Sequence, residues 1–269
     1  MLKAISFLGA SLVCVTLALP IHAEQSQQEC SDVVVNSVGK FLKIKSFNAK
    51  SEDDGIVASA CKVSPNDSDK VYSVFAYTVG QKKIKTSNEP DTKQLIVATV
   101  SLASQQVVGS YQGEIEEDAV TEVGSFRIDT ARYQLTKNLR AFGVVFNSSA
   151  RGPSCADGRW SEELTLYTQQ NSQLVPVLNL PLEATRALQG CLGQSTKVKG
   201  VWETANLSIS VTKSESNGYA DLLLTTKIVR EFDDGTTPAV KKKDENRLMR
   251  FDGKTYKNSQ TPAWWLLFN

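Results

Sequence analysis

Apolar and polar side chains alternate over most of the chain beyond residue 55. β-branched and aromatic residues alternate with polar ones in short runs, and turn-forming residues separate the runs. This period of two is typical of β-strands with one buried face. The predicted strands fall into three sets of four. They cover residues 56–63, 71–79, 95–102 and 106–111; then 125–135, 139–147, 163–168 and 174–178; then 201–211, 219–231, 247–251 and 255–257.

Each set ends in a tight hairpin, at residues 103–105, 170–172 and 252–253. Asp252-Gly253 is the strongest of these signals, because Asp-Gly favours the positive φ angles of a two-residue turn. The hairpins recur about every 70 residues, which indicates repeat units at 55–112, 124–180 and 199–258. Four-stranded meanders with one apolar face must share a core. The pattern therefore predicts an all-β fold, built either as three propeller-blade-like repeats or as a β-sandwich.

Helical periodicity is scarce within this pattern. It occurs in two short segments, residues 32–41 and 182–188. No linker rich in proline, glycine or serine divides the chain. We therefore expect residues 24–269 to form a single all-β domain.

The N-terminal residues have the pattern of a secretory signal peptide. Lys3 is followed by an apolar run from Ala4 to Leu19, and a polar segment begins at Glu24. The run is short for a bilayer span, so a signal peptide over residues 1–23, cleaved after Ala23, is expected. A retained membrane anchor is the alternative. Cleavage predicts a periplasmic or secreted protein with no membrane span.

The charge balance bears on the class of partner. The chain has 30 basic residues, 29 acidic residues and one histidine, His22. Signal cleavage would remove Lys3 and His22 and leave an evenly balanced chain. Such a chain has no overall field that would gather nucleic acid, which is therefore not expected as a partner.

Four cysteines follow the signal peptide, and an even number in an exported chain indicates two disulfides. Sequential pairing, Cys30 with Cys61 and Cys155 with Cys191, closes the shortest loops. Loop length separates the three connectivities by only about 1 kcal/mol, so the sequential pairing also rests on the repeat interpretation. A tetrathiolate metal site is the rival, but the chain has no Cys-x-x-Cys pair for it.

One stretch resembles a known repeat. Asn217-Gly218-Tyr219-Ala220-Asp221-Leu222 resembles the turn and strand of FG-GAP and related propeller-like repeats, and residues 250–256 resemble the hairpin that follows in degenerate bacterial examples. In that family an acidic loop before the strand binds calcium. Here Lys213 stands where the family places its first carboxylate, and it would repel the ion. The resemblance thus implies a β-meander of the kind found in bacterial periplasmic proteins, without a metal site.

The loss of His22 restricts the chemistry of the mature chain. Ser-His-Asp and Cys-His catalysis and histidine-ligated metal sites cannot be assembled. Glycine-rich phosphate loops are absent from the sequence. No catalytic residue and no cofactor is therefore predicted, and the chain is not expected to be an enzyme.

Paired carboxylates are the catalytic device that remains. The candidates are Asp53/Asp54, Glu114/Glu116/Glu117/Asp118, Glu162/Glu163 and Asp233/Asp234. A glycan-binding protein or carboxylate-dependent glycan hydrolase would need two such acids and a tryptophan, from Trp160, Trp202 or Trp264, in one groove. Adjacent acids on a strand point to opposite faces, and Asp233-Asp234-Gly235 is typical of a turn.

Two segments are candidate binding surfaces. The C-terminal aromatic residues Trp264, Trp265 and Phe268 are either an anchor for a partner or a segment packed into the core. The polar stretch 233–246 is either a second such surface or a hairpin loop.

The leading functional hypothesis is an exported, non-catalytic binding protein of the cell envelope, with a protein as its ligand, such as an inhibitor or immunity protein. Glycan binding or hydrolysis is the second hypothesis. A structural envelope component is the third.

Overall fold

The computed structural model describes most of the chain beyond the predicted signal peptide, which itself lies outside the described residues. These are residues 28–45, 47–48, 55–78, 93–115, 121–150, 152–192, 199–258 and 263–266. Over these ranges no helix has both the length and the apolar character that a bilayer crossing requires.

The described elements are one α-helix, thirteen strands and one short 3-10 helix. They are α1 (Asp32–Leu42), β1 (Gly55–Ser64), β2 (Asp67–Thr78), β3 (Lys93–Ser101), β4 (Gln106–Ile115), β5 (Phe126–Gln134), β6 (Arg140–Phe146), β7 (Gly158–Gln170), β8 (Gln173–Gln189), β9 (Val201–Ser216), β10 (Tyr219–Phe232), β11 (Val240–Lys241), β12 (Glu245–Phe251), β13 (Tyr256–Asn258) and η1 (Trp264–Leu266).

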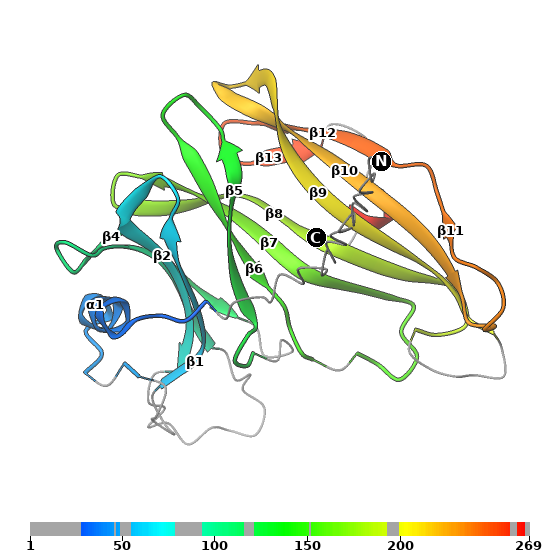
Figure 1. Cartoon of the computed structure of the whole chain (residues 1–269), viewed down its shortest axis with the longest axis horizontal. Coiled ribbons are helices and arrows are strands. Elements are labelled where there is room, and N and C mark those ends of the chain that lie inside the picture. The colour runs from blue at the N-terminus through cyan, green and yellow to red at the C-terminus, as the bar shows by residue number, and fades with distance from the viewer. Residues whose placement is uncertain are drawn as a thin grey trace, which may run out of the picture.

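The strands form three antiparallel meanders, β1–β4, β5–β8 and β9–β10–β12–β13, as the sequence predicts. They belong to one open sheet. The first meander joins the second through a single parallel pair, Ser110 with Gln173, and the second joins the third through the antiparallel ladder of β8 and β9. The all-β prediction is confirmed, and the sandwich alternative fits, because the sheet folds into stacked layers and does not form separate blades (Figure 1).

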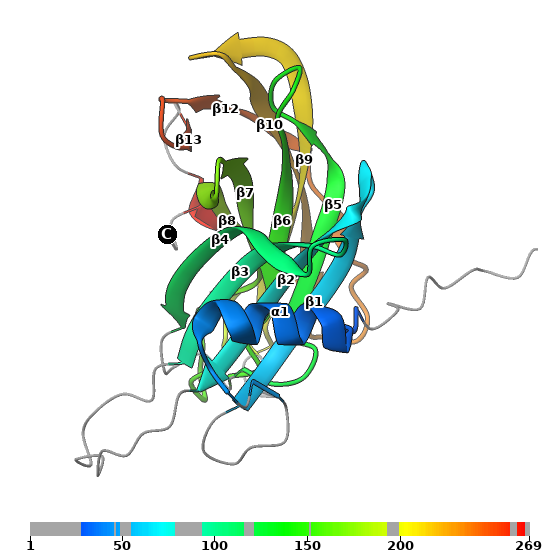
Figure 2. The same ribbon diagram turned by 90° about the vertical axis from the view of Figure 1, so that its left-hand side faces the viewer.

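The first meander is buried on both faces. Helix α1 lies across one face (Figure 2) and packs Val34 and Val38 against Phe75 of β2 and Ile96 of β3. The helix predicted over residues 32–41 is therefore confirmed. The opposite face of this meander packs against the second meander, with members such as Val74 in that core.

The second meander is the middle layer and is also buried on both faces. In β6, Phe142 and Val144 face the first meander, whereas Ala141 and Val145 face the third. Strands buried on both sides read as continuous apolar runs, and β6 has five consecutive buried residues.

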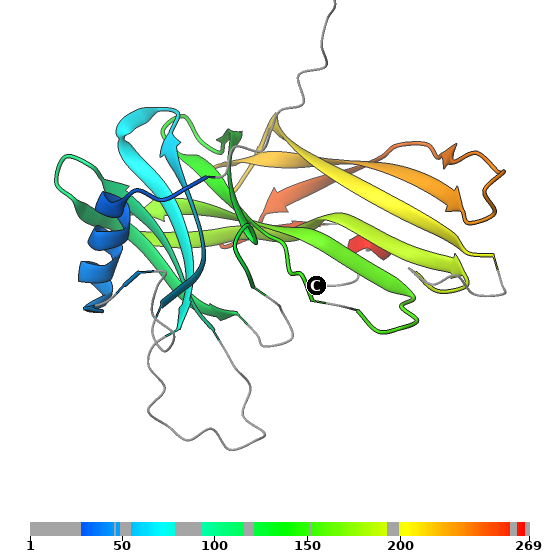
Figure 3. The ribbon, with the colours of Figure 1, turned by 60° about the horizontal axis from the view of Figure 1, so that its bottom comes forward.

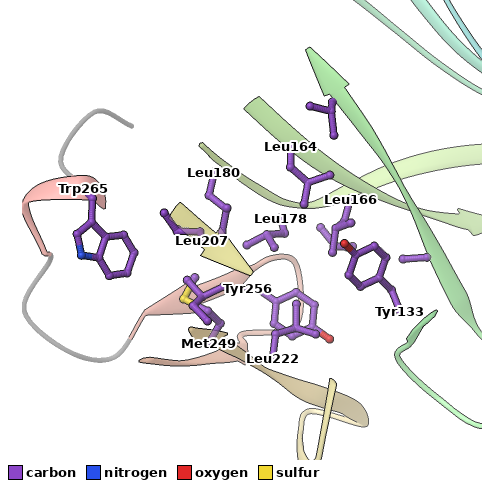
Figure 4. Close-up of a cluster of buried hydrophobic side chains, with 14 of the residues drawn as sticks. Tyr133, Leu164, Leu166, Leu178, Leu180, Leu207, Leu222, Met249, Tyr256 and Trp265 are labelled. Atoms are coloured by element: carbon purple, nitrogen blue, oxygen red, sulfur yellow. The ribbon is translucent and has the colours of Figure 1, made fainter. Parts of the chain in front are cut away.

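The third layer has one buried face. Strand β9 accordingly alternates, with Ala205 and Leu207 in the core and Asn206 and Ser208 exposed. This layer faces β7 and β8 across a further hydrophobic core, which we call the third core, and η1 contributes Trp265 to it (Figure 3). The indole of Trp265 points into that core, in which it is fully buried (Figure 4).

The helix predicted over residues 182–188 is wrong, because these residues extend β8 to Gln189. Glu183, Ala184 and Arg186 favour helices in isolation. In the fold they pair with β7 on one side and β9 on the other, and alternate residues enter the core. Two ladders of hydrogen bonds and the burial of Ala184 outweigh local propensity.

Both predicted disulfides are confirmed, Cys30–Cys61 and Cys155–Cys191. The first ties the segment before α1 to β1. The second joins the loop before β7 to the residues after β8, where Ala156 also pairs with Leu192. Two disulfides are typical of proteins that fold in an oxidising, exported environment.

Candidate functional site

Three charged residues form a row across strands β8, β9 and β10, at the end of the sheet that borders the third core. Arg186 of β8 pairs with Glu203 of β9, and Glu203 pairs with Arg230 of β10. Directly paired residues on neighbouring strands share a face. The next row on this face is Ala184 of β8, Ala205 of β9 and Ile228 of β10, which are buried in the core. The three charges therefore lie on the core-facing side of the sheet, where the core ends.

Glu203 is completely buried and is held by three cations. Arg186 donates from Nε and Nη2 to Oε2 at 3.1 and 2.7 Å. Arg230 donates from Nε and Nη2 to Oε1 at 3.2 and 2.8 Å. Lys242 adds its Nζ, 2.5 Å from Oε1. We call Arg186, Glu203, Arg230 and Lys242 the Glu203 cluster.

Lys242 reaches the cluster through the backbone after β11. The two residues of β11 pair with β10, Val240 with Arg230 and Lys241 with Val229. The amide of Lys242 then donates to the carbonyl of Ile228. Consecutive residues of this segment point to opposite faces, so Lys242 faces Glu203 while Lys241 points away.

The cations keep Glu203 ionised. Burial alone would raise the pKa of its carboxyl, but hydrogen bonds from Lys242, Arg186 and Arg230, together with the charge of Arg186, lower the pKa from 4.5 to about 2. Three positive charges therefore surround one negative charge at neutral pH. The cluster carries a net charge of two positive units.

Aromatic and apolar side chains lie on the same face of the sheet as the cluster. The guanidinium of Arg186 lies 4.5 Å from the ring centre of Trp264 in η1. Exposed Val240 continues the row beyond Arg230. Trp160 of β7 pairs with Ala184 on the same face, is 44% exposed, and donates from Nε1 to Glu163 at 2.7 Å. Together these residues form a mixed cationic and aromatic surface.

The predicted C-terminal aromatic anchor is only partly available. Trp265 is fully buried in the chain's own core, so for this residue the packed alternative holds and it is not exposed to a partner. Its ring also lies 5.4 Å from the guanidinium of Arg247. Trp264 is partly exposed beside Arg186. Phe268 lies outside the described residues.

The acidic candidates that lie within the described residues form hydrogen bonds or ion pairs with neighbouring residues. Asp234 accepts hydrogen bonds from the backbone and side chain of Thr237 and from the backbone of Thr236, and these lower its pKa. The turn predicted at Asp233-Asp234-Gly235 is confirmed. Glu114 accepts a hydrogen bond from Gln94 of the neighbouring strand. Asp53, Asp54, Glu116, Glu117 and Asp118 lie outside the described residues.

Glu162 and Glu163 lie at an irregularity in β7. Glu162 has a positive φ of 55° and pairs with Arg127 at 3.8 Å, whereas Glu163 holds the indole of Trp160. A surface depression beside α1 is lined by residues such as Asp32, Lys40 and Lys43, and none of the three candidate tryptophans borders it. Neither this depression nor the irregularity in β7 is the groove of two carboxylates and a tryptophan that the glycan hypothesis requires.

The stretch that resembles FG-GAP repeats forms the β9–β10 hairpin. Asn217 and Gly218 make its two-residue turn with φ angles of 49° and 79°. Asp221 is buried and accepts a hydrogen bond from Ser214 at 2.8 Å. Over the described residues, no three or more histidine, cysteine, aspartate or glutamate side chains gather as a metal site would require.

Sequence reasoning missed the Glu203 cluster, although one signal for it was present. Glu203 and Arg230 fall on the apolar phase of their strands, in step with Ala205 and Ile228. A charge on the buried phase of an alternating strand needs a partner. Finding which partner requires the register between strands. One of the cations comes from the stretch 233–246, for which the sequence left both a binding surface and a hairpin loop open.

Comparison with protein-family models, with curated proteins and with solved structures found no match to this chain.

Proposed function

We propose that this protein is an exported, non-catalytic binding protein of the bacterial periplasm or cell surface, and that its ligand is another protein. The Glu203 cluster carries the proposal. Export is supported by the signal-peptide pattern and by the two disulfides, Cys30–Cys61 and Cys155–Cys191.

The chemistry of the cluster favours binding over catalysis. Glu203 has no exposed surface and a pKa of about 2, so it neither accepts nor donates a proton near neutral pH. Arg186 and Arg230 supply guanidinium groups, which donate hydrogen bonds and accept none. What remains is a rigid set of charges and hydrogen-bond donors, which suits recognition.

The composition of the surface favours a protein ligand. Tryptophan and arginine dominate the energetics of protein–protein interfaces, and here Trp264 stacks on Arg186 beside Arg230 and exposed Val240. The net positive charge of the cluster complements an acidic partner surface. We therefore assign the docking site to the face formed by Trp160, Val240, Trp264 and the Glu203 cluster.

Affinity capture with matched variants tests the proposal. The purified chain from Glu24 onward, its Lys242→Gln variant and its Lys241→Gln variant are immobilised and exposed to a periplasmic extract. Lys241 is the control because it is the neighbouring lysine, is 66% exposed and pairs with Asp244 outside the cluster. A protein retained by the wild type and by Lys241→Gln, but depleted on Lys242→Gln, supports the proposal.

Two results would contradict it. Equal retention of every protein by the three baits would show that the cluster is not the docking site. Retention of soluble peptidoglycan fragments without any protein would favour the glycan alternative, in which Trp160 and Trp264 would serve as platforms for sugar rings.

A further inference from the structure

The Glu203 cluster holds more positive charge than its carboxylate uses. One cation neutralises a buried carboxylate, but here three converge on it. Their side chains remain 36% exposed for Arg186 and Arg230 and 39% for Lys242. All three side chains that carry the excess charge therefore keep part of their surface accessible to solvent.

Both arginines keep a complete edge for a second ligand. A guanidinium has five N–H donors and can grip a carboxylate by its side edge, Nε and Nη2, or by its end edge, Nη1 and Nη2. Arg186 and Arg230 each use the side edge on Glu203. Across the described residues no partner occupies Nη1 of either arginine, so both end edges are available.

Glu203 cannot absorb these remaining donors. Its Oε2 already accepts two hydrogen bonds from Arg186, and its Oε1 accepts two from Arg230 in addition to the Lys242 ammonium. Glu231 accepts from Trp202 and Thr204 on the opposite face of the sheet.

The buried carboxylate also fixes the geometry of the donors. Each guanidinium is held by two hydrogen bonds, and Trp264 stacks on Arg186. Side chains held in this way lose little conformational entropy when they bind a further group. Glu203 therefore serves as an internal template that orients the cations toward an external ligand.

We propose that the Glu203 cluster is an oxyanion-binding site, and that its ligand is a carboxylate of an acidic side chain on the partner protein. The end edges of Arg186 and Arg230 and the ammonium of Lys242 bind the carboxylate oxygens, and Trp264 borders the site. The source of the carboxylate rests on the proposed function. Binding of a small carboxylate by the cluster does not depend on it.

The test is a titration of the ¹⁵N-labelled chain from Glu24 onward with an acetylated, amidated tetraglutamate peptide. Binding is followed through the Nε–H signals of Arg186 and Arg230 and the indole N–H of Trp264. We expect saturable shifts in these signals, with an affinity that falls as NaCl is raised. Lys241→Gln should leave the affinity within about twofold, whereas Lys242→Gln should weaken it about tenfold, because a charge-assisted contact is lost.

A second variant separates geometry from net charge. Arg230→Lys keeps the positive charge but removes the guanidinium fork, and we expect it also to weaken tetraglutamate binding about tenfold. Urea denaturation of each variant, followed by tryptophan fluorescence, establishes that the fold is retained. Equal affinities for Lys241→Gln and Lys242→Gln, or shifts that do not saturate at the cluster, would overturn the proposal.

The two proposals fail in different ways. If tetraglutamate binds the cluster but no extract protein depends on Lys242, the oxyanion site stands and the protein-binding function is wrong. If a protein is captured through Lys242 but tetraglutamate does not shift the signals of the two arginines, the oxyanion site is wrong.

Discussion

Replacing Glu203 with glutamine removes the negative charge that three cations share, while it leaves the shape of the side chain nearly unchanged. The pKa of Glu203 is 4.5 in an unfolded chain and about 2 in the folded protein. This difference corresponds to about 3 kcal/mol of stability at neutral pH. Loss of one member of a buried ion pair has a similar cost, about 3–5 kcal/mol. We therefore expect Glu203→Gln to lower the free energy of unfolding by about 3 kcal/mol at pH 7.

The pH dependence gives a sharper version of this prediction. Because folding depresses the pKa, the contribution of Glu203 is fully present above pH 4.5 and is lost as the pH falls toward 2. By pH 3 the wild type should have lost about 2 kcal/mol of it. The difference in stability between the wild type and Glu203→Gln should therefore shrink to about 1 kcal/mol at pH 3.

Urea denaturation at pH 7 and pH 3, monitored by tryptophan fluorescence under non-reducing conditions, measures both quantities. Glu215→Gln is the matched control, because Glu215 lies on the same strand and is exposed. We expect it to change stability by less than about 0.5 kcal/mol. A loss below about 1 kcal/mol for Glu203→Gln at pH 7, or a difference that stays constant between the two pH values, would refute the reasoning.

Three further predictions about packing and cross-linking are tested by the same urea measurement. Gly143→Ala should lower the free energy of unfolding by about 1–3 kcal/mol, because its Cβ would lie 2.5 Å from a methyl carbon of Leu164 in β7. Gly152→Ala is the control, since a Cβ there meets nothing within 4 Å. Equal stability of the two alanine variants would contradict this prediction. Trp265→Ala should cost about 3–5 kcal/mol through the cavity it leaves, and a cost below about 1 kcal/mol would mean that this segment does not complete the core. Replacing both cysteines of Cys155–Cys191 with serine should cost about 3–4 kcal/mol for a separation of 36 residues, and an unchanged urea midpoint would argue against that bond.

The sequence was sufficient to predict the three meanders, because a period of two is visible wherever a strand has one buried face. It could not predict how the meanders stack. In β6 the residues from Ala141 to Val145 are all buried on alternating sides, so the pattern does not reveal that two cores meet there.

The local errors have physical causes. The predicted two-residue turn at Asp252-Gly253 is a four-residue loop, because Phe251 pairs with Tyr256 and Asp252 accepts hydrogen bonds from the backbone of Lys254 and Thr255. The two-residue turn of this meander occurs at Asn217-Gly218 instead.

The candidate site could not be predicted because it depends on register. Arg186, Glu203, Arg230 and Lys242 are spread over four segments of the chain. The apolar phase on which Glu203 and Arg230 fall shows that a partner is needed, but it does not identify that partner. Only the pairing of β8, β9, β10 and the residues after β11 brings them together. Sequence patterns report local periodicity, whereas this cluster is a product of long-range pairing.

The third core joins residues that are synthesised far apart in time. Tyr133 and Leu135 of the middle layer pack in the same cluster as Trp265. At ordinary rates of translation the later residues follow the earlier ones after on the order of ten seconds. Until the third layer and Trp265 have been synthesised, the cover of one face of the middle layer is incomplete. The nascent chain therefore exposes apolar surface of the kind that chaperones bind.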